Sequence, residues 1–147
     1  MKWKRILTII SGSEELSPHH SSFMSISHSQ SNDLHALVTK LQLKPKKERL
    51  FNEKFSVKAR ALIFAHLSRV SIPPSLENDR DKFLVNILPL LSEFQQITSA
   101  IIYHKMSNAI KHGPTFDTFM SCMQLSSLII QGIDAGASPL TQLPHIN

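Results

Sequence analysis

The chain has 147 residues, of which 41% are hydrophobic, and it carries a formal net charge of +5 at pH 7. A chain of this length fits one domain and can bury roughly two thirds of its unfolded surface. Its single cysteine, Cys122, excludes an internal disulfide, and no apolar run approaches the ~20 residues that span a bilayer. We therefore expect a single domain over residues 1–147 without a transmembrane segment.

The N-terminal third is predicted to hold a short helix followed by a flexible loop. Apolar residues over 4–11 predict the helix, which ends near Gly12. Residues 11–31 contain nine serines and three histidines with few apolar anchors, so we expect them to form a flexible loop. A phosphorylation site or a histidine metal site is the less favoured alternative, because no cysteine or carboxylate stands at ligand spacing.

A second helix and a basic linker are predicted next. Apolar residues at i, i+3, i+4 and i+7 predict an amphipathic helix over 33–43, capped by Asn32 or Asp33. Between residues 40 and 60 stand eight basic residues against two glutamates, a local balance of +6. We expect residues 44–55 to form a basic linker.

Four linker residues are the candidate contacts for an anionic partner: Lys44, Lys46, Lys47 and Arg49. An acidic protein segment or an anionic lipid surface would fit such a charge, and a solvated linker without a partner is the other interpretation. No specific nucleic acid is expected, because only Phe51 and Phe55 could stack on bases within the cluster.

An almost wholly apolar stretch is predicted to form a central buried helix over residues 56–70. Every residue from 61 to 67 except His66 is apolar, and a helix apolar on all sides belongs inside a bundle. Ser56 is the expected N-cap, and the prolines at 73 and 74 end the helix by Ser71. We interpret His66 as a hydrogen-bonded core or rim residue rather than a catalytic base.

Two further helical segments are predicted in the second half. An apolar stripe at helical spacing runs over 84–102, and Pro89 is expected to break or sharply kink it near Leu88. Thr115 is the expected cap of a last helix that runs to Gly136. The methionines and phenylalanines of that helix could form an adaptable peptide-binding groove, but we favour core packing, and a buried thiol at Cys122.

The predicted fold is an all-α helical bundle of about four to six helices. No catalytic constellation, cofactor site or metal site is visible, so we expect a protein that is not an enzyme. The expected core residues are Leu62, Phe64, Leu67, Leu88, Leu91, Phe119, Met123 and Ile130.

Several segments, in order, resemble the Sec sixty-three domain, also called the Brl domain. They are KARALIFAHLSRVSIPPSLENDRDKFL at 58–84, MQLS at 123–126, IQG at 130–132 and SPLTQLPHI at 138–146. The resemblance covers residues 56–146, is looser over 4–43 and is absent from the serine-rich loop, so it indicates a partial domain.

That domain occurs in a translocation subunit of the endoplasmic reticulum and in Brr-type RNA or DNA helicases. The resemblance implies a non-catalytic scaffold on the cytosolic face of the endoplasmic reticulum membrane, which assists post-translational import together with the Sec channel complex and associated membrane subunits. The alternative is an accessory domain of a Brr-type helicase that contacts nucleic acid. The chain has no His-Pro-Asp tripeptide, so no Hsp70 contact is expected, and it has no Walker A loop for a helicase motor.

Overall fold

The computed structural model describes residues 3–43 and 53–132, and all regular structure within these ranges is helical. The prediction of an all-α bundle is therefore confirmed. Two short 3-10 turns, η1 and η2, accompany the α-helices. The elements are α1 (Trp3–Ser11), η1 (Glu14–Leu16), η2 (Ser22–Met24), α2 (His28–Lys40), α3 (Lys54–Leu67), α4 (Pro74–Met106) and α5 (Phe116–Gln131).

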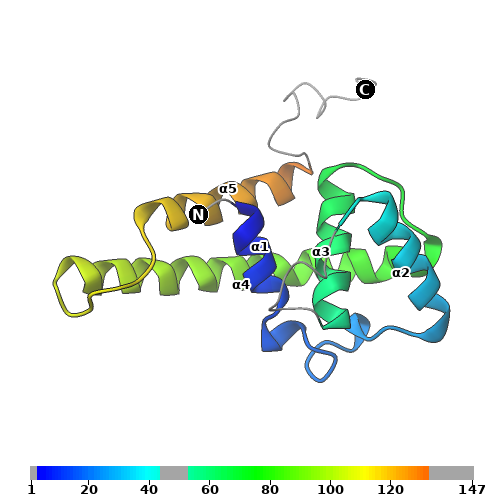
Figure 1. The fold of residues 1–147 in the computed structure, drawn as a ribbon, viewed down its shortest axis with the longest axis horizontal. Helices are drawn as coiled ribbons and strands as arrows, with labels where there is room; N and C mark the ends of the chain where they lie inside the picture. Colours follow the sequence, from blue (N-terminus) through cyan, green and yellow to red (C-terminus); the bar gives the residue numbers. More distant parts are fainter. Residues whose placement is uncertain (1–2, 44–52, 133–147) are drawn as a thin grey trace.

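The helices are arranged around α3 and along α4. In Figure 1, α4 is the long horizontal helix, α3 stands across its first half together with α2, and α5 lies beside its second half. The central helix α3 contacts each of the other four α-helices, whereas α1 bridges α3 and α5. The hydrophobic core therefore lies where α3 crosses the bundle.

The burial of α3 agrees with the prediction of a central core helix, but its start differs. Nine of its fourteen residues are buried. The N-cap is Glu53 rather than Ser56, which lies inside the helix and is fully buried. Lys54 and Phe55, which we placed in the basic linker 44–55, belong to this helix, and residues 44–52 lie outside the described part of the chain.

The second helix begins earlier than the apolar stripe predicted. Its N-cap is Ser27, not Asn32 or Asp33, and the Ser27 hydroxyl accepts a hydrogen bond from the Gln30 N–H at 3.3 Å. The Gln30 side chain in turn accepts from the Ser27 N–H, which completes a capping box. Hydrophobic periodicity did not reveal this start, because the residues of the first turn of α2 are polar.

The fourth helix is continuous through Pro89, so of the two alternatives that we expected near Leu88, a break or a sharp kink, the break was wrong. Pro89 removes the hydrogen bond to the Val85 carbonyl. Both Pro89 and Val85 are exposed, so water can satisfy that carbonyl on the solvent side of the helix. The helix begins at Pro74, where a proline in the first turn is favourable.

The serine-rich segment 11–31, which we expected to form a flexible loop, contains both 3-10 turns and the first residues of α2. Leu16 and Met24, which end the two 3-10 turns, have 2% and 0% of their surface exposed, and both belong to the core. The Ser21 hydroxyl donates to the Glu15 carbonyl at 2.8 Å and ties one turn to the next. Both 3-10 turns contact α3, and η2 also contacts α4.

Candidate functional site

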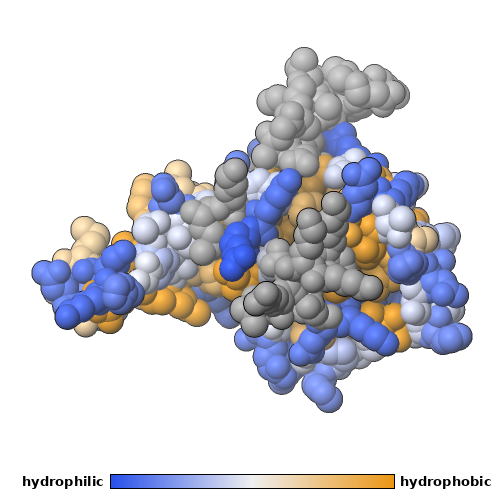
Figure 2. Space-filling model, viewed as in Figure 1, coloured by the Kyte–Doolittle hydropathy of each residue, from blue (hydrophilic) through white to orange (hydrophobic). Residues whose placement is uncertain are grey.

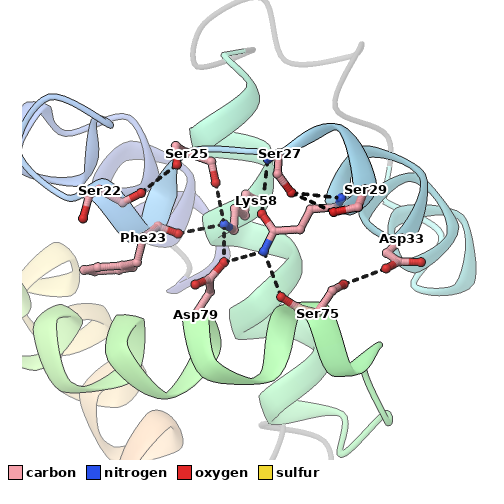
Figure 3. Close-up of polar contacts among 10 residues, drawn as sticks. Ser22, Phe23, Ser25, Ser27, Ser29, Asp33, Lys58, Ser75 and Asp79 are labelled. Atoms are coloured by element: carbon pink, nitrogen blue, oxygen red, sulfur yellow. Dashed lines mark hydrogen bonds and ion pairs between the residues drawn. The ribbon is translucent and has the colours of Figure 1, made fainter.

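A buried ion pair is the most tightly bonded polar site in the described part of the chain. The Lys58 Nζ lies 2.7 Å from the Asp79 Oδ2, so the pair joins α3 to α4. The same nitrogen donates to the carbonyls of Phe23 at 2.7 Å and Ser25 at 2.9 Å, as Figure 3 shows. Three acceptors use all three protons of the ammonium group, which is fully buried.

Gln30 extends this polar cluster to the second helix. Its Nε2 donates to the Asp79 Oδ2 and to the Ser75 carbonyl, both at 2.8 Å. The Ser75 hydroxyl donates to Asp33 at 2.6 Å, which adds a second link between α2 and α4 (Figure 3). The polar cluster therefore fastens α2, α3, α4 and the serine-rich segment together.

Sequence reasoning missed this polar cluster because it counted Lys58 and Arg60 in a basic surface segment. Lys58 has 0% of its surface exposed and Arg60 has 7%, so neither adds to an exposed basic patch. A lysine within an otherwise apolar buried helix was the signal for a carboxylate partner, because an unpaired buried charge is very costly. Nothing in the spacing pointed to Asp79, which stands 21 residues away.

The C-terminal ends of α3 and α5 meet and bond to each other. The His66 Nε2 lies 2.9 Å from the Ile129 carbonyl oxygen, and the Arg69 Nε donates to the Gly132 carbonyl at 3.1 Å. These carbonyls belong to the last turn of α5 and to its C-cap, Gly132, which has the left-handed conformation with φ of 65°. The helix thus ends at Gln131 and not at Gly136, where we expected its end. His66 is thus the hydrogen-bonded rim residue that we expected, and basic groups at a helix C-terminus are favourable.

The expected core residues divide into three groups. Leu62, Leu67 and Leu91 are buried. Phe64, Leu88 and Phe119 are half-buried, and the first two pack against the core. The assignment of the remaining two to the core was wrong, because Met123 and Ile130 are 46% and 72% exposed on α5.

The predicted anionic contacts belong to the basic linker. Lys44, Lys46, Lys47 and Arg49 all lie outside the described residues. The only cysteine of the chain, Cys122, is buried, and this burial raises the pKa of its thiol. Within residues 3–43 and 53–132, no three histidine, cysteine or carboxylate side chains gather closely enough to hold a metal ion.

None of the helices in the described ranges combines the length and the apolar character needed to cross a membrane.

Comparison with known proteins bears on the resemblance to the Sec sixty-three domain. No protein-family model matches the chain. The chain is, however, 30% identical over 99% of its length to the Translocation protein SEC63 homolog of mouse, and to those of human and Pongo abelii. The predicted resemblance is confirmed.

The similarity to the SEC63 homologues concerns only a part of those proteins. The aligned region makes up 20% of each relative, so the chain spans about a fifth of their length. In the structure, the segment 58–84 that carries the resemblance forms most of α3 and the first turns of α4. This segment contains both partners of the buried ion pair, Lys58 and Asp79.

Proposed function

We propose that this chain is a non-catalytic helical scaffold in protein translocation at the endoplasmic reticulum, exposed on the cytosolic face of the membrane. The observation that carries the proposal is the similarity over 99% of the chain to three translocation proteins. In this role the domain holds neighbouring parts of the translocation machinery, including the Sec channel complex, in a fixed relation.

The internal bonding of the bundle supports a scaffold role. A scaffold must keep its surfaces in a constant arrangement, and the polar cluster around Lys58 and Asp79 links three helices and the serine-rich segment. An arrangement that separated α3 from α4 would leave the Lys58 charge buried without its counterion, which is costly. The cluster therefore favours the one arrangement in which the two charges are paired.

The chemistry of the described side chains supports the non-catalytic part of the proposal. The buried Lys58 ammonium donates to three acceptors within the fold, so its hydrogen-bonding capacity is fully used there. The Cys122 thiol lies in the core with a raised pKa, which disfavours the reactive thiolate. His66 bonds to a backbone carbonyl at the end of α5 rather than to a nucleophile.

The names of the relatives favour the translocation subunit over the helicase as the interpretation of the resemblance. Those compared above are named as translocation proteins and not as helicases. The predicted partner of Lys44, Lys46, Lys47 and Arg49, an acidic protein segment or anionic lipid, remains part of this proposal.

Proximity labelling and protease protection together test the proposal. The chain is expressed in cells with a labelling enzyme and an epitope at its N-terminus. We expect biotinylated proteins to be enriched in Sec channel subunits, and protease added to intact microsomes to remove the epitope without detergent. Enrichment of nuclear RNA-processing proteins instead, or an epitope protected until detergent is added, would contradict the proposal.

A further inference from the structure

Three adjoining hollows run along one side of the paired helices α4 and α5, and together we call them the α4–α5 groove. The first is lined by Tyr103 and Phe119 and the second by Met123, and Gln95 lines both. The third hollow lies at the end of α3 and shares Ile130 with the second. The groove therefore follows the antiparallel helix pair.

The α4–α5 groove presents large apolar side chains to solvent along its length. Tyr103, Met123 and Ile130 have 70%, 46% and 72% of their surface exposed. Figure 2 shows patches of apolar surface, interspersed with hydrophilic surface, on the arm that α4 and α5 form at its left. Contiguous exposed apolar side chains mark interaction sites, and methionine adapts readily to different partners.

The charges along the groove indicate the chemistry of its occupant. No aspartate or glutamate stands among the described residues that line the three hollows. His66, Arg69 and Arg80 line the end near α3, and His104 lines the opposite end. The two arginines among the lining residues, Arg69 and Arg80, therefore both stand at the α3 end.

Arg80 is the basic residue best placed to meet a carboxylate. Its guanidinium donates to the neighbouring Asp81 at 3.1 and 3.2 Å, and the Asp81 side chain is 67% exposed. Exposed ion pairs of this kind contribute little, about 0 to 1 kcal/mol, so an incoming carboxylate can compete for the guanidinium. The planar guanidinium can also bind two carboxylate oxygens at once.

We propose that the α4–α5 groove binds an acidic amphipathic helix of a partner protein. Its apolar side chains lie over Phe119, Met123 and Ile130, and its carboxylates meet Arg80 at the α3 end. The distance along α4 from Arg80 to Tyr103 corresponds to roughly 35 Å of helix, which suits a partner helix of about six turns. Recognition of an amphipathic helix by a hydrophobic groove is a common mode of peptide binding.

Fluorescence anisotropy with synthetic peptides tests this proposal on the full chain. The probe is a labelled helical peptide of about 20 residues, roughly 30 Å long, with leucines on one face and glutamates at one end. A matched peptide carries lysines in place of the glutamates. We expect saturable binding of the glutamate peptide, with binding of the lysine peptide weaker by about tenfold, because like charges then meet at Arg80.

Three variants locate the binding. Met123→Glu should lower the affinity for the glutamate peptide by about tenfold or more, as loss of a central interface residue does. Arg80→Gln should reduce the difference between the two peptides. Val85→Glu changes an apolar residue of α4 that is 73% exposed but lines none of the three hollows, so it should leave binding unchanged. Circular dichroism checks that each variant is folded.

Three outcomes would overturn the proposal. Equal affinity for the two peptides would show that Arg80 does not select a carboxylate. A loss of affinity in Val85→Glu equal to that in Met123→Glu would show that the peptide binds outside the groove. Sedimentation that shows a dimer, which Met123→Glu dissociates and the peptide does not compete for, would assign the groove to a second copy of the chain. None of these outcomes bears on the translocation role, which the labelling experiment tests separately.

Discussion

The hydroxyl groups of Ser11 and Ser56 lie 2.8 Å apart and join α1 to α3 within the core, although 45 residues separate them in sequence. The Ser11 hydroxyl also donates to the Thr8 carbonyl at 2.7 Å. Because a hydroxyl has one proton, Ser56 must donate the bond between the two serines. Both residues are buried, so water cannot replace this bond.

A double-mutant cycle should detect this bond between α1 and α3. We expect Ser11→Ala and Ser56→Ala to be coupled by about 1 kcal/mol in the free energy of unfolding, since each change removes the same hydrogen bond. Urea titration measures the four proteins. The exposed hydroxyl pair of Ser27 and Ser29, at 3.0 Å, is the matched control and should show coupling near zero. Equal coupling for both pairs would contradict the assignment.

Loss of the Asp79 carboxylate should strongly destabilise the bundle. Asp79→Ala leaves the Lys58 ammonium buried without its counterion, so we expect a loss of about 3 to 5 kcal/mol in the free energy of unfolding. Asp81→Ala is the control, because it breaks the exposed pair with Arg80 and should cost at most about 1 kcal/mol. Similar urea midpoints for the two variants would show that the Lys58–Asp79 pair is not buried.

Burial separates two residues that we first assigned to the same core. Leu62→Ala should cost about 2 to 5 kcal/mol, because it opens a cavity at a fully buried position. Met123→Ala, on the exposed side of α5, should change stability by about 0.5 kcal/mol or less. Thermal or urea unfolding measures both, and a loss at Met123 equal to that at Leu62 would restore the original core assignment.

The Cys122 thiol should react slowly with thiol reagents in the folded protein. Burial shields it and raises its pKa above the ordinary value of 9.0, so less thiolate forms at a given pH than in the unfolded chain. A disulfide reagent such as Ellman's, at neutral pH with and without denaturing urea, measures the rates, and the one cysteine gives a single phase. A folded rate equal to that in urea would contradict its burial.

The sequence predicted where helices form better than it predicted which of their faces are packed against other helices. A nearly uninterrupted apolar run located the central helix, and the Thr115 cap followed by apolar residues at helical spacing located the final helix. The exposure of Met123 and Ile130 could not be read from that spacing, since α5 packs on α1, α3 and α4 and leaves its remaining face open. Composition predicted disorder for 11–31, where Leu16 and Met24 act as anchors.

The candidate site was harder to predict than the fold, for a related reason. The capping interactions of His66 and Arg69 depend on where α5 ends in space, and the Lys58–Asp79 pair depends on how α3 crosses α4. Neither relation leaves a local pattern in the sequence. The resemblance at 58–84 pointed to the correct segment without showing which of its side chains meet.

Replacement of the matching segment in a SEC63 homologue by this chain tests the translocation role most directly. In cells that lack the endogenous protein, the chimera is compared with the intact human homologue for import of a secretory reporter into the endoplasmic reticulum. We predict that the chimera restores import, and that a chimera with Asp79→Ala restores less because its bundle is destabilised. A chimera that accumulates to the normal level in the membrane but leaves import as low as in depleted cells would contradict the account.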